Sequence, residues 1–280
     1  MLLERRPDDE ARRHNWSRIA VSVILTVSLV AVLGFVATGR AGASSASSPP
    51  PVASLHCPIL MYHYVDASPV AGAAGSRLTV RTREFERQMD FLAQKGYPAV
   101  SLAQVQAAME SGAALPAKPI VLTFDDGGLD DYTVAYPILR SHDFVAAFFV
   151  ITASVGEASS MTWSQLREMQ RNGMEIQSHT ESHPDLTKLT NDALTAELSR
   201  SRLMIQAQLG TAPIALSYPF GYYNRRVIDS AQAAGYLMAV TTHQGRTLAS
   251  SSIFSLPRIH VNGTQTFKDF ERSLGFAVTL

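Results

Sequence analysis

The sequence predicts an α/β fold, a distorted (β/α) barrel of seven strands that is preceded by one N-terminal transmembrane helix. Short apolar runs alternate with segments of helical spacing, which is the pattern of repeated βα units. Most of these runs are apolar almost throughout, as expected for parallel strands that are covered on both faces. The membrane segment is predicted separately, from one long uncharged stretch near the N-terminus.

Seven apolar runs are the predicted strands, at 58–65, 120–124, 144–151, 174–178, 213–218, 237–242 and 254–261. Helical spacing is found at 82–95, 131–141, 191–209, 224–234 and 265–274. Capping boxes indicate two further helix starts, one at Ser101 with Gln104 and one at Thr162 with Gln165. Elements in this order predict a barrel that is closed or slightly open.

The N-terminal part has the composition of a membrane anchor and a tether. Residues 19–39 carry no charged side chain, and 21 residues at a rise of about 1.5 Å span the roughly 30 Å of a bilayer core. Five arginines lie before this segment, so the positive-inside rule predicts a cytoplasmic tail over 1–18 and places the rest of the chain outside. The Gly-, Ala-, Ser- and Pro-rich stretch that follows predicts a flexible linker over 40–56, before a folded domain over 57–280.

A cleaved signal peptide is the alternative interpretation of this segment, because Ala41, Gly42 and Ala43 offer small residues for cleavage. The apolar stretch is longer than the usual signal core of about 7–15 residues, which favours an anchor that is retained. A retained anchor would hold the protein at the membrane of the cell envelope, and a cleaved one would leave it secreted. Both interpretations place the folded domain outside the cytoplasm.

The composition excludes several classes of function. The formal net charge is zero and the pI is about 7.1, so nothing indicates a nucleic-acid partner. The lone cysteine, Cys57, excludes an internal disulfide, a cysteine-rich metal site and a CxxC redox motif. Nothing around Cys57 indicates a reactive thiol, so a packing role is expected for it.

Polar and aromatic residues follow four of the predicted strands. In a barrel of parallel strands, active-site residues gather at the carboxyl ends of the strands. The sequence places at these ends Asp125, Asp126, His179, Tyr218, Phe220 and His260. Groups from four separate strands are therefore expected on one face of the barrel.

One carboxylate and two imidazoles of this region could bind a divalent metal ion. Asp125 and Asp126 leave their strand in opposite directions, so one can bind the metal while the other faces the substrate. His179 and His183 can converge on one ion from a helical turn or a tight loop, and Pro184 favours the loop. Positions for water and substrate would stay open on the ion, as in catalytic zinc sites.

Each of these motifs alone has a common structural explanation. A single HxxxH arises often by chance, and an Asp-Asp-Gly sequence most often forms a turn. Their combination at predicted strand ends of an exported barrel favours a hydrolase site. The same ligands could hold ferrous iron in an oxygenase, but that chemistry has no use for the neighbouring carboxylate of Asp125.

Four motifs, in this order and spacing, resemble those of a known family: TFDDG at 123–127, HTESH at 179–183, YPFG at 218–221 and LPRIH at 256–260. The region from about 57 to 265 resembles the polysaccharide deacetylase family, which is carbohydrate esterase family 4 with its NodB-homology domain. The opening CPILMYHYV and the stretch SHPDLTKLT are more similar to the poly-β-1,6-N-acetylglucosamine deacetylase branch. This resemblance implies metal-dependent N-deacetylation of an extracellular or cell-wall N-acetylglucosamine polysaccharide, with release of acetate.

The resemblance also implies a role for each matching residue. Asp125 is the implied general base, and His260 lies at the position of the catalytic acid. His63, at the end of its predicted strand, is a second candidate for the acid and His243 a weaker third. The implied ligands of one divalent ion, zinc by default with cobalt, nickel and iron as alternatives, are Asp126, His179 and His183.

A glycan polymer is the implied partner, and the third motif is the implied wall of its groove. That wall consists of Tyr218, Pro219, Phe220 and Gly221, with a backbone N–H facing the oxyanion. The flat ring of Tyr222, like that of Phe220, suits the apolar face of a pyranose.

Two departures from the family pattern concern the base and the acid. The third motif usually begins with an arginine that holds the base, and Ser217 stands at that position. The usual Asp-rich, Trp-containing fourth motif is not evident around 237–245. Other interpretations therefore stay open: the same site could deacetylate peptidoglycan, chitooligosaccharides or xylan, or the fold could be a non-catalytic glycan-binding module.

Overall fold

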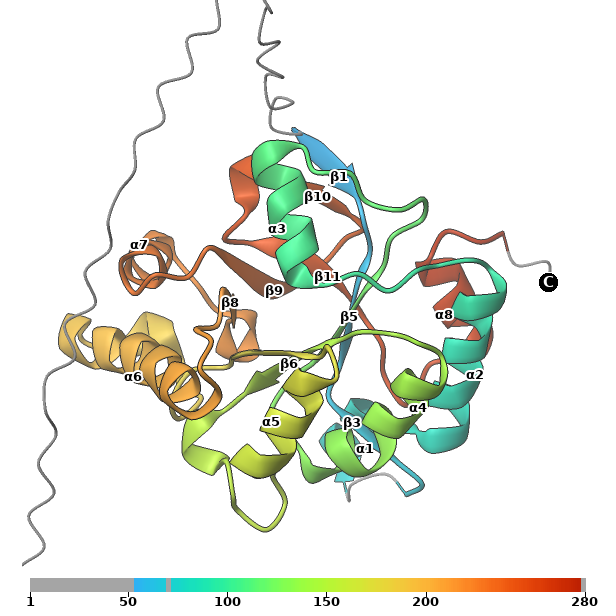
Figure 1. Cartoon of the computed structure of the whole chain (residues 1–280), viewed down its shortest axis with the longest axis horizontal. Coiled ribbons are helices and arrows are strands. Elements are labelled where there is room, and N and C mark those ends of the chain that lie inside the picture. Colours follow the sequence, from blue (N-terminus) through green and yellow to red (C-terminus); the bar gives the residue numbers. More distant parts are fainter. Residues whose placement is uncertain (1–52, 69–71, 278–280) are drawn as a thin grey trace, which may run out of the picture. The chain divides into compact units, whose positions relative to one another are not determined.

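The computed structural model of the chain describes residues 53–68 and 72–277 (Figure 1). The predicted tail (1–18), the predicted membrane segment (19–39) and most of the predicted linker lie outside the described residues, so they remain predictions. Within the two described ranges, no helix combines the length and the apolar character that a membrane span needs.

Seven parallel strands form a closed barrel, as the sequence predicts. The strands follow one another in chain order, and the last one closes the ring by pairing with the first. The barrel is distorted where β7 and β8 share a single residue pair and where the register shifts between β9 and β11. The strands are β2 (Ile59–Tyr62), β5 (Val121–Phe124), β6 (Ala147–Val150), β7 (Glu175–Ser178), β8 (Ala215–Ser217), β9 (Met238–Gln244) and β11 (Leu256–His260).

Helices surround the barrel, and their starts agree with the sequence signals. Ser101 and Thr162 both form complete capping boxes, with Gln104 and Gln165 as their partners. The helix predicted over 191–209 is present with the same bounds. The α-helices of the described residues are α1 (Gly72–Leu78), α2 (Thr82–Gln94), α3 (Leu102–Ser111), α4 (Tyr136–Ser141), α5 (Trp163–Arg171), α6 (Asn191–Leu209), α7 (Arg225–Ala233) and α8 (Phe267–Ser273).

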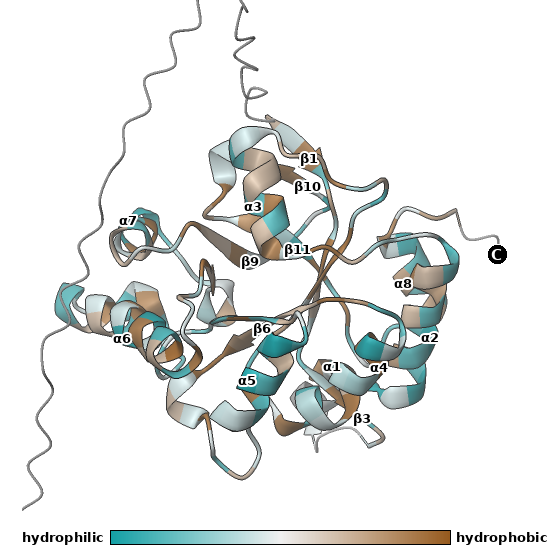
Figure 2. Cartoon of the chain, in the orientation of Figure 1, coloured by the Kyte–Doolittle hydropathy of each residue, from teal (hydrophilic) through white to brown (hydrophobic). Residues whose placement is uncertain are grey.

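Alternate strand residues face two different apolar layers. On β2, Ile59 joins one buried cluster, whereas Leu60 and Tyr62 join another. Because successive side chains of a strand point to opposite faces, the first cluster fills the barrel and the second lies under the helices. Figure 2 shows β6 and β9 in hydrophobic brown, while α5 on the outside is largely teal.

The first predicted strand (58–65) is divided into two strands. β2 ends at Tyr62, and the chain then leaves the barrel to form β3 (Tyr64–Asp66), which pairs with β4 (Thr79–Arg81). His63 occupies the break between β2 and β3. A continuous apolar run does not reveal such a change of pairing partner, because both strands are apolar alike.

Two further differences concern the ends of elements. The helix predicted over 131–141 begins with a π-helical turn, η1 (Asp131–Ala135), before α4. Upstream of Cys57, β1 (Ser54–His56) pairs antiparallel with β10 (Thr247–Ala249), so the folded part includes residues at the end of the predicted linker. Cys57 itself is buried in the barrel cluster, and burial raises the pKa of its thiol to about 12, which agrees with a packing role.

Glu175, the first residue of β7, caps α3 at the amino-terminal end of the barrel. Its carboxylate accepts hydrogen bonds from the N–H groups of Leu102 at 2.7 Å and Ala103 at 3.1 Å. We expect Glu175→Ala to lower the free energy of unfolding by about 1–2 kcal/mol, because two N–H groups at the helix start lose their acceptor. Urea denaturation measures this change, with the exposed Glu110→Ala at the end of α3 as control. Equal stabilities of Glu175→Ala and the wild type would show that this cap adds nothing.

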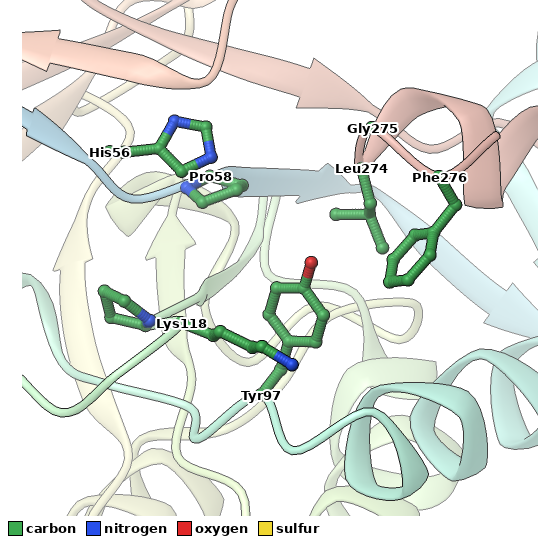
Figure 3. A pocket seen from close by; sticks show the side chains of 8 residues that line it. His56, Pro58, Tyr97, Lys118, Leu274, Gly275 and Phe276 are labelled. Atoms are coloured by element: carbon green, nitrogen blue, oxygen red, sulfur yellow. The ribbon is translucent and has the colours of Figure 1, made fainter.

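The same end of the barrel carries a pocket of about 260 Å³ (Figure 3). Pro58 and Pro119 line it, and they lie just before β2 and β5. The rings of Tyr97 and Phe276 form an aromatic wall, with centroids 6.3 Å apart. This pocket contains none of the predicted site residues, which lie at the opposite, carboxyl end of the strands.

Candidate active site

The carboxyl ends of the strands bring the predicted chemical groups together on one face. Asp125 follows β5, His179 follows β7 and His63 follows β2. All three are in phase with the strand residues that point into the barrel. Asp125 and His179 are buried, and His63 is partly buried. Polar groups therefore gather at the mouth of the barrel, next to the apolar cluster that fills it.

Asp126, His179 and His183 form a compact group whose ligand atoms all lie within 4.8 Å of one another. The Nε2 atoms of the two histidines are 3.1 Å apart. Oδ1 of Asp126 lies 3.5 Å from Nε2 of His179 and 3.9 Å from Nε2 of His183. Two nitrogens bound to one tetrahedral zinc ion at about 2.0–2.1 Å would be about 3.3 Å apart. The three residues therefore fit a single divalent ion, as the sequence predicts.

Neighbouring groups orient these ligands. Nδ1 of His179 lies 2.8 Å from the carbonyl oxygen of Ser217, which can only accept, so Nδ1 carries the proton and Nε2 keeps its lone pair for a metal. The hydroxyl of Tyr64 donates to Oδ2 of Asp126 at 3.1 Å, which leaves Oδ1 to the imidazoles. Asp126 and His183 have left-handed backbone conformations, with φ of 78° and 61°, and such strain is typical of functional sites.

We expect Tyr64→Phe to weaken zinc binding by about tenfold, because the carboxylate of Asp126 loses the hydrogen bond that orients it. Competition with a chromophoric chelator measures the affinity. Tyr132→Phe is the matched control, since its hydroxyl donates to Glu168 and not to a site residue. An affinity that is the same for Tyr64→Phe and the wild type would exclude this orienting role.

A fully buried arginine holds Asp125. Nη1 and Nη2 of Arg258, on β11, donate to Oδ1 and Oδ2 of Asp125 at 2.8 and 2.7 Å. Ser217 completes the network, since its hydroxyl donates to Oδ2 of Asp125 at 3.2 Å and accepts from Nη2 of Arg258 at 3.1 Å. The arginine that the family pattern places at position 217 is thus replaced by Arg258 from another strand.

The sequence contains one signal for Arg258, and it is easily overlooked. Side chains two residues apart on a strand face the same side, so Arg258 faces the same side as Leu256 and His260. An arginine in a strand is rarely buried without a partner, and its partner here is 133 residues away. The departure at Ser217 therefore does not leave the carboxylate of Asp125 without support.

The arginine controls the charge of Asp125. Burial alone would raise the pKa of this carboxyl, but the charge and the hydrogen bonds of Arg258 outweigh burial and hold the pKa well below its usual value. Asp125 is therefore ionised at neutral pH. A carboxylate in this state can accept a proton from a nearby group and cannot donate one.

The two candidate acids have different surroundings. Nε2 of His260 lies 2.7 Å from the carbonyl oxygen of Thr242, so the protein itself binds this nitrogen. Burial lowers the pKa of His63, and the negative charges of both Asp125 and Asp126 oppose that effect. Burial also lowers the pKa of His260, and there the negative charge of Asp125, without that of Asp126, opposes the effect of burial. His63 is thus the candidate that lies in the field of both carboxylates.

The third motif differs from the implied groove wall. Tyr218 is buried with its hydroxyl on the carbonyl of Phe254, and Pro219 is buried as well. The structure therefore corrects the prediction for these two residues, whose side chains support the segment from within. Phe220 and Tyr222 are 54% and 55% exposed, with ring centroids 5.8 Å apart, as a glycan-binding wall needs.

The motif, which forms the short helix η4 (Pro219–Gly221), lies tightly against β9. A Cβ on Gly221, which has a φ of 74°, would come within 2.0 Å of Oγ1 of Thr242, so this position requires glycine. Phe220 has a left-handed φ of 58°, and its ring contacts His183 edge-on at a centroid distance of 4.7 Å. The exposed ring is thereby held next to a candidate metal ligand.

A cleft of about 450 Å³ lies beside the candidate metal ligands Asp126 and His183. Asp126 and His183 form one side of it, and a serine-rich loop after η2 (Thr152–Ser154) forms another. Its full lining is Tyr64, Asp126, Gly128, Ile151, Ser154, Glu157, Ser159, Ser160 and His183. The cleft has the size and polarity to hold one sugar unit beside the ligands.

A barrel with a candidate metal group and an arginine-held carboxylate at its carboxyl face has the architecture of a hydrolase. Comparison with known proteins agrees: the family model described as polysaccharide deacetylase matches residues 112–239. The Bacillus subtilis protein YxkH, which is named as a polysaccharide deacetylase, is 32% identical over 205 residues, covering 73% of this chain and 71% of the relative. The chain belongs to the polysaccharide deacetylase family.

Two other known proteins are similar to this chain. The poly-β-1,6-N-acetyl-D-glucosamine N-deacetylase of Escherichia coli is 27% identical over 240 residues, and the match covers 70% of this chain but only 36% of that protein. The deacetylase PplD of Streptococcus pyogenes, solved in complex with acetate, superposes with a TM-score of 0.73 at 33% identity, over 79% of this chain and 98% of that one.

Proposed function

We propose that the protein is a metal-dependent N-deacetylase that hydrolyses acetamido groups of an N-acetylglucosamine-containing polysaccharide and releases acetate. The observation that supports this most is the ionised Asp125 next to the group of Asp126, His179 and His183 at the mouth of the barrel. An oxygenase would use the three ligands and have no use for Asp125. A glycan-binding module would need neither the ligands nor the buried pair of Asp125 with Arg258.

Asp125 is proposed to accept the proton of the attacking water. Arg258 and Ser217 hold its carboxylate in one orientation, so little freedom is lost when the substrate binds. Asp126, His179 and His183 would hold a divalent ion, which would supply Lewis-acid polarisation of an amide carbonyl and would lower the pKa of water to about 7. These two effects together make water a nucleophile at neutral pH.

The third motif is proposed to supply a backbone donor for the oxyanion. The N–H groups of Tyr218, Gly221 and Tyr222 donate to carbonyl oxygens of the protein, and Pro219 has no N–H. Phe220 is therefore the residue of this segment with an N–H to offer. One such donor contributes about 3–4 kcal/mol to stabilising the transition state.

His63 is proposed as the proton donor to the leaving amine. We expect His63→Asn to lower kcat by about 10²–10⁴-fold with little change in KM, because the amine must then leave without a proton. His260→Asn should have a smaller effect, since Nε2 of His260 is bound by the carbonyl of Thr242. Steady-state kinetics of both variants measures the difference. A larger loss of kcat in His260→Asn would assign the acid to His260 instead.

The proposed substrate is poly-β-1,6-N-acetylglucosamine, in agreement with the name of the Escherichia coli relative. The test is acetate release from this polymer, peptidoglycan, chitooligosaccharides and acetylated xylan, each with the wild type and with Asp125→Asn. The proposal predicts release from the first polymer above the others, and none with the variant. Release that persists in Asp125→Asn would overturn the role of this residue, and a preference for another glycan would change the substrate.

The proposed location is the cell envelope, with the barrel outside the cytoplasm and residues 19–39 as the anchor. Fractionation of cells that express the full chain tests this location. Recovery with the membranes supports a retained anchor, recovery from the medium supports cleavage, and recovery from the cytosol would refute export.

A further inference from the structure

We infer that an open pocket beside the catalytic cleft binds a second, neutral sugar unit of the polymer, adjacent to the unit that loses its acetyl group. This inference rests on the proposed function and specifies how the polymer lies on the protein. The pocket has a volume of about 450 Å³ and is lined by Thr187, Gly221, Tyr222, Tyr223 and His243. No carboxylate, lysine or arginine is part of this lining.

A series of rings connects the metal group to this pocket. His183, which lines the catalytic cleft, contacts Phe220 at a centroid distance of 4.7 Å. Phe220 contacts Tyr222 at 5.8 Å, and Tyr222 lines the second pocket. The exposed ring of Phe220 therefore lies between two hollows of similar volume, each large enough for a sugar unit. A glycan with one unit at the metal group would pass over Phe220 to reach the second hollow.

The walls of the second pocket are built into the fold. The ring of Tyr223 stacks on the buried Tyr218, with centroids 5.2 Å apart and planes inclined by 17°. On the other side, Thr187 belongs to the short helix η3 (Leu186–Lys188), where its carbonyl oxygen accepts a hydrogen bond from Arg226 at 3.1 Å. Walls that are fixed before binding need not be ordered by the ligand, which favours affinity.

The chemistry of the lining indicates the class of ligand. The exposed ring of Tyr222 offers a flat apolar face, which suits the C–H face of a pyranose. His243 offers ring nitrogens that can bond sugar hydroxyls. The carboxylate of Asp185, which accepts a hydrogen bond from the N–H of Thr187, pairs with Lys188 at 3.1 Å. A glucosammonium or a uronate would find no unpaired counter-ion in this lining, so a neutral N-acetylated unit fits best.

The test uses β-1,6-linked N-acetylglucosamine oligomers of one to five units. The wild type should show a rise of kcat/KM between the monomer and the longer oligomers. Tyr222→Ala and His243→Ala should each lower the ratio of kcat/KM for the pentamer to that for the monomer by about fivefold to tenfold. Leu237→Ala is the matched control, because Leu237 is an exposed apolar residue just before β9, at the other end of the barrel.

Calorimetric titration of the same pentamer separates the inference from the proposed function. If Tyr222→Ala binds the pentamer more weakly than the wild type does, but the wild type releases no acetate, the second subsite stands and the proposed function is refuted. If the wild type releases acetate and the ratio of kcat/KM for the pentamer to that for the monomer is unchanged in both variants, the proposed function stands and the second subsite is refuted. A wild type that neither binds nor hydrolyses the pentamer would overturn both.

Discussion

Replacing Arg258 by methionine is expected to lower the free energy of unfolding by about 3–5 kcal/mol and to abolish measurable deacetylation. The guanidinium is fully buried, and its removal leaves the carboxylate of Asp125 buried without its counter-charge. The same change frees the carboxylate from the orientation in which the two nitrogens hold it. Chemical denaturation measures the first effect, and acetate release measures the second.

Two further variants separate charge from geometry. Arg258→Lys keeps a positive charge but cannot form two parallel hydrogen bonds, so its stability and activity should lie between those of the wild type and Arg258→Met. Combining Arg258→Met with Asp125→Asn removes both buried charges and should recover most of the lost stability without restoring activity. An Arg258→Met protein as stable and active as the wild type would contradict the proposed role of the pair.

Loss of a proposed metal ligand should have the second large effect. We expect His179→Ala and Asp126→Asn each to lower kcat/KM by about 10³-fold or more, because several kcal/mol of charge stabilisation depend on the bound ion. The control is His142→Ala, since His142 pairs with Asp90 at 2.9 Å and takes no part in the site. Activity assays with excess zinc measure both effects.

His183 allows a more specific experiment, because its side chain is partly exposed in the cleft. His183→Ala leaves a space that free imidazole can enter. Added imidazole should therefore restore part of the activity of His183→Ala and none of that of Asp125→Asn. Failure of rescue, together with normal zinc binding by His183→Ala, would remove His183 from the ligand set.

Much of the site could be predicted because its signals are local in the chain. Asp126 comes second after an apolar run, next to Asp125, and His179 and His183 lie four residues apart just after another run. In a parallel barrel, residues after successive strands must meet at one end, so position in the chain determines position in space. The closed barrel of seven strands is confirmed by the structure, which also brings Asp126, His179 and His183 close enough together to bind one metal ion.

The remaining features depend on contacts that no local pattern records. Arg258 meets Asp125 because closure of the barrel brings β11 next to β2 and so near β5. The side chain of Tyr218 turns inward, whereas Phe220 turns outward through its left-handed backbone. Neighbouring aromatic residues of one motif thus have opposite exposures, which composition alone does not distinguish.

The most direct test of the metal site is titration of the chelator-treated wild type with zinc, with bound zinc and acetate release measured in parallel. We expect no activity without metal, and activity that rises in proportion to bound zinc until about one ion is bound per chain. His179→Ala should show neither the binding nor the rise. Full activity of the metal-free protein, or unchanged zinc binding by His179→Ala, would contradict a catalytic ion held by Asp126, His179 and His183.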